Sequence, residues 1–340
     1  MTEAPSPEPH TDSDDPCHDT APRRRPSSAE PRWIPRGTEI VDAVPARIYN
    51  YAVGGMHCFK TDRALWDRIT TLYPSARVAA RANREFLERV TEWLSACGIR
   101  QFLDIGAGIP EGGATHETVR DLDPDARVVY VDLDPIAVEQ ARDLLREDQK
   151  AHAVRGDLLD PQHIVYHDAV MSFLDFGEPV AVILGTVLQF ITDDADAARS
   201  ISSLVEALAP GSLLVITHAM LDANPDQQRR QQDAYQLFGQ HTPTPAVLRT
   251  PDQLGALIDP RCTLLPPGIV TADQWQAEPA GCDHLRWLDG QDPPGVLVAV
   301  ARLRSARDPA GDHTAAASPI GSAPAVAEAG SLASGTAQDG

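Results

Sequence analysis

The chain has 340 residues, of which 49 are acidic and 29 are lysine or arginine, so its formal net charge is −20. An acidic surface repels polyanions, and we therefore expect no nucleic-acid partner. The longest apolar run, PVAVILGTVLQFI at 179–191, is too short to span a bilayer, and the N-terminus lacks the pattern of a signal peptide. These features predict a cytoplasmic protein with no membrane partner.

The cysteines also favour a reducing compartment. There are five of them, without a CxxC pair, which is typical of free thiols. Cys282 and His284 could supply two metal ligands, but no second pair at metal-binding spacing accompanies them, so we expect no metal site.

Composition divides the chain into four segments. Residues 1–31 are rich in proline, serine and acids, and residues 306–340 in alanine, glycine, serine and proline. Neither end can bury enough apolar surface to fold, so both are predicted to be disordered tails. Residues 32–98 are predicted to form a helical cap or lid, and residues 99–305 a domain of alternating strands and helices.

From residue 76 onward, helical and extended patterns alternate. Residues 76–98 predict a helix, because Phe86, Val90 and Leu94 recur at helical spacing and Gly98 ends the pattern. Five continuous apolar runs then predict parallel strands covered on both faces, followed by two late strands. We therefore expect an α/β fold with a doubly wound, mostly parallel, seven-stranded sheet. The predicted strands lie within 99–105, 126–132, 151–157, 179–185, 212–219, 262–270 and 295–303.

A glycine-rich turn follows the first strand, in the stretch FLDIGAGIPEGG at 102–113. Gly106 and Gly108 allow a ligand to approach the backbone closely. A dinucleotide site would have a third glycine at position 111, but Glu111 stands there, at the expected start of the next helix, where its carboxylate would repel a phosphate. This argues against a nicotinamide-dependent oxidoreductase and favours S-adenosylmethionine, a nucleoside ligand without phosphate.

The ends of later strands supply carboxylates that suit this ligand. Asp132 ends the second strand, where it can accept hydrogen bonds from both ribose hydroxyls. Asp134 competes for this role but, with the proline after it, is also a good start for the following helix. Asp157 can bind the adenine amino group or cap the next helix, and Asp104 can face the ligand's ammonium group or the amides of the glycine turn. The predicted cofactor contacts are Asp104, Gly106, Ala107, Gly108, Asp132, Leu133, Asp157, Leu158 and Gly185.

These segments resemble the S-adenosyl methyltransferase family of actinobacterial proteins that was formerly classed as a domain of unknown function. The resemblance rests on QFLDIGAGIPEGGATHE with DARVVYVDLDP, on the upstream PARIYNYAVGGMHCFKTDR and ANREFLERV, and on VAVILGTVLQFITDD, LAPGSLLVITHA and LLPPGIVTADQW. It covers nearly all of the chain between the two tails. It implies a class I, Rossmann-like methyltransferase fold with S-adenosylmethionine as the cofactor.

This chain departs from the family pattern in three places. The family usually has threonine or serine where Ala107 stands, and threonine where Glu111 follows Pro110. It commonly has histidine where this chain has Gln189. If that histidine is a general base in relatives, this chain lacks it.

Methyl transfer from a sulfonium mainly requires alignment of donor and acceptor, and some acceptors need no base. The catalytic candidates are His116 and His218 as a base and Gln189 as a hydrogen-bonding contact to the acceptor, although either histidine could be purely structural. Tyr49 and Tyr51 are further catalytic candidates, because their hydroxyls could orient an acceptor. The stretch RIYNYAVGG at 47–55 favours either a mobile lid, with Tyr49 and Tyr51 over the sulfonium, or a surface helix ended by glycine. The candidates for binding the cofactor's carboxylate are Arg81, Asn83 and Arg84.

The sequence therefore predicts an S-adenosylmethionine-dependent methyltransferase that acts on an unidentified, small-molecule acceptor. The alternative is a protein that binds S-adenosylmethionine or its demethylated product without catalysis, as a sensor or a partner protein. The residues at positions 111 and 189 leave this alternative open.

Overall fold

The computed structural model describes residues 42–275 and 295–305. The predicted tails at 1–31 and 306–340, the first part of the predicted cap segment, and the pair Cys282 and His284 lie outside the described residues. Within the described ranges, none of the helices combines the length and the apolar character needed to cross a membrane.

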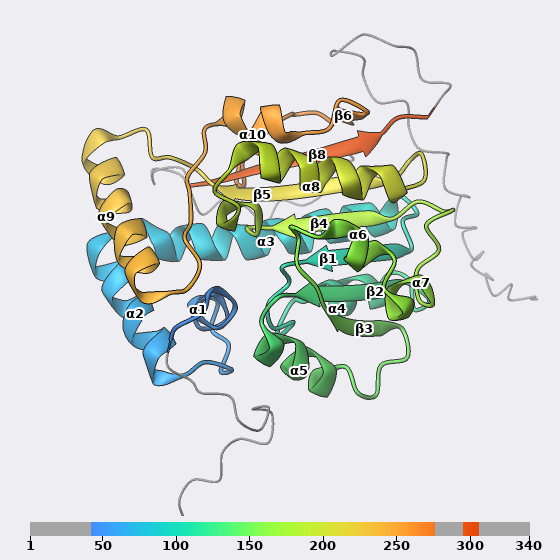
Figure 1. Cartoon of the computed structure of the whole chain (residues 1–340), viewed down its shortest axis with the longest axis horizontal. Coiled ribbons are helices and arrows are strands. Elements are labelled where there is room, and N and C mark those ends of the chain that lie inside the picture. Colours follow the sequence, from blue (N-terminus) through green and yellow to red (C-terminus); the bar gives the residue numbers. More distant parts are fainter. Residues whose placement is uncertain (1–41, 276–294, 306–340) are drawn as a thin grey trace, which may run out of the picture.

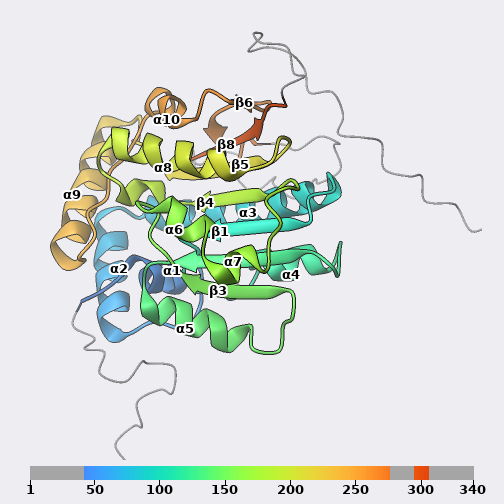
Figure 2. The same cartoon turned by 45° about the vertical axis from the view of Figure 1, so that its right-hand side comes forward.

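Helices cover both faces of one central sheet, so that the domain has three layers (Figures 1 and 2). The helices are α1 (Pro45–Ala52), α2 (Lys60–Leu72), α3 (Ser75–Ala96), α4 (Thr115–Arg120), α5 (Pro135–Leu144), α6 (Pro161–Val165), α7 (Asp168–Met171), α8 (Asp194–Ala207), α9 (Pro225–His241) and α10 (Pro251–Leu257), with a 3₁₀ turn η1 (Leu188–Phe190). The strands are β1 (Gln101–Ile105), β2 (Arg127–Asp132), β3 (Ala151–Arg155), β4 (Ala181–Gly185), β5 (Leu213–Ala219), β6 (Cys262–Leu264), β7 (Val270–Thr271) and β8 (Val296–Leu303).

The strand order confirms the predicted doubly wound fold. The order is β3-β2-β1-β4-β5-β8-β6, and β7 also pairs with β8. Strands β1 to β5 are parallel, whereas β8 runs antiparallel to β5, β6 and β7. The sheet has eight strands where seven were expected, because the predicted strand at 262–270 is divided into β6 and β7. Pro266 and Pro267 lie at the division, and proline has no N–H to donate to a neighbouring strand.

Helix α4 begins later than the sequence indicated. The expected start lay directly after Pro110, but the helix starts at Thr115. Gly112 and Gly113 have φ angles of +56° and +70°, which are not helical, so the loop after the glycine turn continues through them. The carboxylate of Glu117 then accepts hydrogen bonds from the amides of Gly113 and Ala114, at 2.7 and 3.2 Å, and closes the start of the helix.

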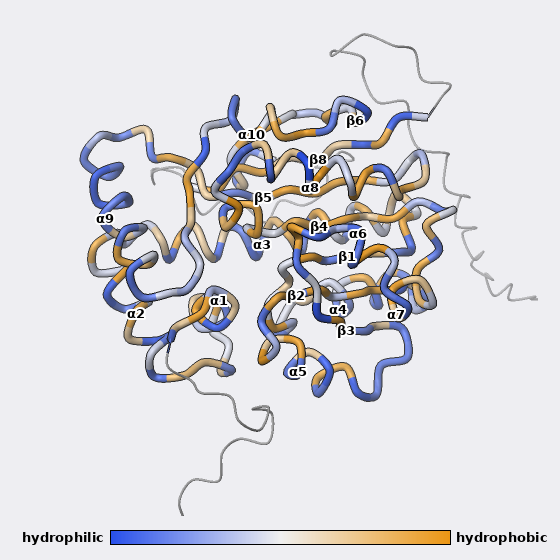
Figure 3. The backbone as a smooth tube through the Cα atoms, viewed as in Figure 1, coloured by the Kyte–Doolittle hydropathy of each residue, from blue (hydrophilic) through white to orange (hydrophobic). Residues whose placement is uncertain are grey.

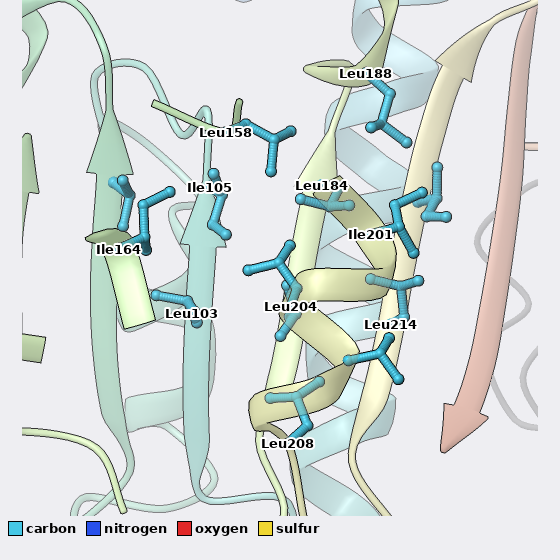
Figure 4. Close-up of a cluster of buried hydrophobic side chains, with 14 of the residues drawn as sticks. Leu103, Ile105, Leu158, Ile164, Leu184, Leu188, Ile201, Leu204, Leu208 and Leu214 are labelled. Atoms are coloured by element: carbon cyan, nitrogen blue, oxygen red, sulfur yellow. The ribbon is translucent and has the colours of Figure 1, made fainter. Parts of the chain in front are cut away.

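Two apolar cores hold the layers together. On one face, the strands pack against α6, α7, α8 and α10, and Figure 4 shows side chains of this cluster from Leu103 on β1 to Leu214 on β5. On the other face they pack against α3, α4 and α5, where Phe86, Val90 and Leu94 of α3 are fully buried. Burial of each such side chain contributes about 1.5–3 kcal/mol. Most of β4 and β5 has hydrophobic colour in Figure 3, as is typical of strands buried on both faces.

A third cluster forms a helical cap over one end of the sheet. It joins α1, α2, the start of α3 and α9, with Ile48, Trp66, Ile69, Ala234 and Leu237 among its buried members. Helix α9 comes from beyond β5, so the cap includes more of the chain than the predicted segment at 32–98. In Figure 1 the arrowheads of β1 and β4 point toward α1, α2 and α9, so the cap faces the carboxyl ends of the parallel strands.

Candidate functional site

A cavity of about 600 Å³ lies between the carboxyl ends of the parallel strands and the helical cap. In a doubly wound sheet this end is where ligands bind. The cavity brings together all nine residues predicted to contact a cofactor: Asp104, Gly106, Ala107, Gly108, Asp132, Leu133, Asp157, Leu158 and Gly185. Tyr49, Asn83, Arg84 and Gln189 also line it, whereas Tyr51, Arg81, His116 and His218 do not.

The backbone of the glycine turn after β1 has a conformation and close neighbours that suit glycine. Gly106 has a φ of +72°, and a Cβ atom there would lie 2.4 Å from Val187 on the loop after β4. Gly108 has a φ of +65°, and its nearest neighbour would be Ala46 of α1 at 3.7 Å. The amides of Gly106 and Ala107 both donate to the carbonyl of Val131 on β2, at 2.8 and 3.2 Å. Glycine is therefore required at Gly106 by conformation and by space.

Asp132 lies across the glycine turn from β1. Its Oδ2 accepts a hydrogen bond from the amide of Gly108 at 2.7 Å, and its Oδ1 accepts one from the amide of Asp134 at 2.8 Å. Burial raises the pKa of Asp132 to about 6, although these amides favour the ionised form. Each carboxylate oxygen keeps a further lone pair with which to accept a hydrogen bond from a ligand.

The residue that competes with Asp132 has another role. Asp134 is the N-cap of α5, where its Oδ1 accepts a hydrogen bond from the amide of Ile136 at 3.0 Å. The sequence-based interpretation of Asp134 as a helix start is therefore confirmed, although its side chain also borders the cavity.

Asp104 and Asp157 present carboxylates from two other strand ends. Asp104 Oδ2 accepts a hydrogen bond from Thr115 Oγ1 at 2.9 Å, and burial raises the pKa of Asp104 to about 6. Asp157 accepts a hydrogen bond from the amide of Leu159 at 2.9 Å. The N-cap of α6 is Asp160, so Asp157 is not the cap of that helix.

Glu111 does not stand at a helix N-terminus, as the sequence had indicated, because α4 begins later. Its carboxylate instead accepts hydrogen bonds from Asn50 Nδ2 at 3.0 Å and contacts His57 Nδ1 at 2.8 Å. Burial raises the pKa of Glu111, but these contacts outweigh it and hold the pKa below its usual value. Arg84 donates to the carbonyls of Glu111 and Gly112. The loop after the glycine turn is thus joined to the cap, and Glu111 does not stand at a helix N-terminus where it would repel a phosphate.

An ion pair also joins the cap to the strand-end side of the cavity. The guanidinium of Arg47 on α1 is buried and donates to Asp62 on α2 at 3.0 Å and to Asp134 at 3.4 Å. Asp62 is fully buried and also accepts hydrogen bonds from the amides of Val44 and Phe59, at 3.2 and 2.7 Å. The sequence did not single out Arg47 or Asp62, because their pairing depends on the packing of α1 against α2.

The two tyrosines of α1 lie in different places. Tyr49 lines the cavity, and its hydroxyl accepts a hydrogen bond from Asn83 Nδ2 at 2.8 Å. Tyr51 packs into the apolar cluster of the cap. Helix α1 is held by its buried residues Arg47, Ile48 and Asn50, so it belongs to the packed cap in this structure.

The two candidate histidines have structural partners. His218 is fully buried; its Nδ1 donates to the carbonyl of Ala219 at 2.8 Å and its Nε2 accepts from Arg249 at 2.8 Å. Burial lowers the pKa of His218 to about 4, which favours this neutral form. His116 is bonded to the hydroxyl of Tyr130 through both its amide and its Nδ1, each at 2.8 Å.

Gln189 lies on the loop after β4, which is fixed from several directions. Arg249, itself buried, donates to the carbonyls of Leu188 and Ile191 at 3.0 and 2.7 Å. The carbonyl of Gln189 accepts a hydrogen bond from the amide of Val247 at 2.9 Å. Figure 4 shows Leu188, next to Gln189, at the end of the apolar cluster near the strand arrowheads.

The start of this loop is strained. Thr186 has a φ of +51°, which is unfavourable for a β-branched residue. Its amide donates to the hydroxyl of Thr217 at 2.9 Å and to the carbonyl of Thr217 at 3.1 Å, which hold it there. Such strain is concentrated at functional sites.

Metal-ligand clusters are not found in the part of the chain that the structure describes: no three histidine, cysteine, aspartate or glutamate side chains converge there. The cavity is lined by carboxylates, amides, hydroxyls and aromatic rings.

Comparisons with known proteins show which sequences and structures the chain resembles. The family model described as S-adenosyl methyltransferase matches residues 32–301. A crystal structure from Thermobifida fusca YX that carries a methyltransferase assignment is 31% identical, with a TM-score of 0.70, and the match covers 81% of this chain and 100% of that chain. A DUF574 family protein from Streptomyces avermitilis MA-4680 is 32% identical, with a TM-score of 0.68 and coverage of 77% and 97%. None of the curated proteins matches the chain.

Proposed function

The chain belongs to the S-adenosyl methyltransferase family, and on this premise we propose that it methylates a small-molecule acceptor in the cavity between strand ends and cap. Membership makes it an S-adenosylmethionine-dependent methyltransferase. The observation that carries the proposed site is the convergence of all nine predicted cofactor contacts on one cavity that also has a wall of helices.

The residues present fit the chemical groups of the cofactor. We propose that Asp132 accepts hydrogen bonds from the ribose hydroxyls with the lone pairs that Gly108 and Asp134 leave available. Asp104 would accept from the ammonium group, and Asp157 from the adenine amino group. The turn at Gly106 provides the close backbone approach that a nucleoside requires.

When bound, S-adenosylmethionine supplies an electrophilic methyl group on a sulfonium. This chain contributes by positioning the cofactor and the acceptor and by excluding water. No histidine lines the described part of the cavity. Arg47 and Glu111 fasten the cap to the two sides of the cofactor cleft. We propose that Tyr49 and Gln189 contact the acceptor from opposite elements, α1 and the loop after β4.

A small acceptor is supported by the way in which the cap closes over the strand ends. Helices α1, α2 and α9 supply side chains to the same cavity as the strand ends do, so an acceptor has to fit between them. We also propose a cytoplasmic location, which is supported by Cys58, Cys97 and Cys262, all of which are free thiols in this structure.

The cofactor contact is tested by titration calorimetry with S-adenosylmethionine and S-adenosylhomocysteine. We expect Asp132→Ala to weaken binding of both by tenfold or more, a loss of about 1.4 kcal/mol, because the ribose loses its acceptor. Asp125→Ala is the matched control, since Asp125 is an exposed carboxylate paired with Lys150 and is not among the cavity residues. Equal affinity of Asp132→Ala and wild type would contradict the proposed contact.

The acceptor class is tested with S-adenosylmethionine that carries a radioactive methyl group. The protein is incubated separately with the low-molecular-mass and the macromolecular fractions of a cell extract. We expect the label to enter small molecules. Label in protein or nucleic acid would refute a small-molecule acceptor, and tight cofactor binding without transfer to either fraction would support a binding protein instead.

A further inference from the structure

The cavity has one wall without charge. All charged side chains among its described lining residues are Arg84, Asp104, Asp132, Asp134 and Asp157. The four aspartates lie at the ends of strands β1, β2 and β3, and Arg84 donates to the carbonyls of the glycine loop. All of them therefore belong to the cofactor side.

The cap side consists mainly of aromatic and aliphatic side chains. Trp66, Ile69 and Tyr73 line it from α2 and its C-terminal end, and Ala234, Tyr235 and Phe238 line it from α9. We call these six residues the helical wall. An anion bound against them would lose its hydration without gaining an opposite charge, which costs several kcal/mol.

The hydroxyl of Tyr235 on the helical wall remains neutral, and that of Tyr73 acts as a hydrogen-bond donor. Burial raises the pKa of Tyr235, and the nearby Tyr73 raises it further. Tyr73 donates its own hydroxyl hydrogen to Asp222 at 3.1 Å. Neither tyrosine therefore provides a negative charge to bind a cationic acceptor.

Gln189, beside this wall, carries a buried hydrogen-bond acceptor without a partner among the described residues. The side-chain Oε1 of Gln189 is buried and has no hydrogen-bond partner within residues 42–275 and 295–305. A buried acceptor without a donor is destabilising, and because Gln189 lines the cavity, rotation of its side chain would bring Oε1 to a donor on a ligand. The backbone of Gln189 is fixed by Val247, and its neighbours Leu188 and Ile191 by Arg249, so the loop holds this amide at the cavity without ligand.

We propose that the methyl acceptor is an uncharged aromatic molecule that carries a hydroxyl or amino group, and that this group donates a hydrogen bond to Gln189 Oε1. The ring would pack against the helical wall, where aromatic side chains offer edge and face contacts. The stacked pair of Phe190 and Phe238, with ring centres 6.1 Å apart, connects the loop of Gln189 to this wall. The inference rests on the proposed function, since it concerns the acceptor half of the same cavity.

Three model compounds with one ring system test the inference. They are 2-naphthol, which is neutral and has a donor, 2-methoxynaphthalene, which is neutral without a donor, and 2-naphthoate, which is an anion. Each is titrated calorimetrically into the protein saturated with S-adenosylhomocysteine, at neutral pH. We expect 2-naphthol to bind at least tenfold more tightly than either of the others.

Variants then assign the preference to one atom. Gln189→Leu should bring the affinity for 2-naphthol down to that for 2-methoxynaphthalene and leave S-adenosylhomocysteine binding unchanged. Gln236→Leu is the matched control, because Gln236 is exposed on α9 and lies outside the cavity lining. If Gln189→Leu fails to fold, Gln189→Met keeps the length of the side chain and makes the same test.

The outcomes separate the two proposals. If S-adenosylhomocysteine does not bind to the wild type, the proposed function is wrong. If it binds but 2-naphthoate binds as tightly as 2-naphthol, if the donor gives no advantage, or if none of the three compounds binds, the inference about the acceptor is wrong. Retention of the 2-naphthol preference in Gln189→Leu and Gln189→Met would likewise overturn it.

Discussion

The two walls of the cavity differ in how they are built. The strand-end wall, formed by the loops after β1, β2 and β3, is polar, and burial raises the pKa of its residues Asp104 and Asp132 to about 6. The helical wall consists of apolar and aromatic side chains from α2 and α9. Burying carboxylates is costly, so their presence in the strand-end wall indicates a ligand with hydrogen-bond donors at fixed positions. Substitutions in the helical wall would change the shape and size of the cavity without affecting the hydrogen bonds between those carboxylates and the ligand.

The loop from Thr186 to Ile191 joins these walls, and breaking its anchor should give the largest effect. Replacing Arg249 by methionine removes donors from two buried carbonyls and from His218, and leaves Asp194 without its partner. We expect the free energy of unfolding to fall by about 3–5 kcal/mol, as measured by urea denaturation.

A matched control separates this effect from the loss of any arginine. Arg199 is exposed on α8 and pairs with Asp196. Arg199→Met should change the free energy of unfolding by less than about 0.5 kcal/mol. If the two substitutions cost the same, Arg249 does not anchor the loop.

The carboxylates of the strand-end wall should make cofactor binding depend on pH. Protonation of Asp132 removes an acceptor, so affinity for S-adenosylhomocysteine should fall as the pH falls through about 6. One pH unit below this value the loss should be about tenfold for one group, and steeper if Asp104 titrates with it. Calorimetry between neutral and mildly acidic pH measures this slope.

Asp132→Asn provides the comparison for that slope. It should bind more weakly at neutral pH and show a shallower pH dependence, because only Asp104 still titrates. Without ligand, a carboxyl whose pKa is raised destabilises the fold as the pH rises through the window between 3.8 and about 6. The free energy of unfolding of the variant should therefore fall less than that of the wild type as the pH rises through this window, by at most about 3 kcal/mol. Its absolute stability also reflects the loss of one acceptor for the amides of Gly108 and Asp134. If the affinity of Asp132→Asn for S-adenosylhomocysteine depended on pH as steeply as that of the wild type, Asp132 would not be the group whose protonation weakens binding.

The smallest expected effect concerns the strain at the junction of the walls. Asparagine tolerates a positive φ better than threonine, so Thr186→Asn should raise the free energy of unfolding by about 0.5–1 kcal/mol. Thermal unfolding measures this. Thr118→Asn is the control, because Thr118 lies within α4 and is not a positive-φ residue. A loss of stability in Thr186→Asn would mean that the threonine side chain itself supports the loop.

The strand-end wall could be predicted from sequence because each of its parts is local. A glycine turn directly follows a strand, and Asp132 and Asp157 occur at or just after the ends of the next two strands. The parallel sheet then brings these loops to one edge. The error at Glu111 arose within this wall, because Gly112 and Gly113 delay the start of α4 and place the carboxylate beside Asn50.

The helical wall could not be predicted in this way, because its members are distant in sequence. Trp66 and Ile69 on α2 show helical spacing that could have indicated an apolar face, but not that α9 would pack beside it. Arg249 carries no local signal, since its partners lie on the loop after β4 and on β5. His116 and His218 were candidates by position, and only the structure shows their partners Tyr130 and Arg249.

The contacts of Arg249 also form late in the synthesis of the chain. Arg249 follows Leu188 by 61 residues, and chains are synthesised at about 5–20 residues per second. The glycine turn and strands β1 to β4 therefore leave the ribosome several seconds before the guanidinium that fixes the neighbouring loop. A nascent chain thus possesses the elements of its strand-end wall before it can fix the loop that joins the two walls.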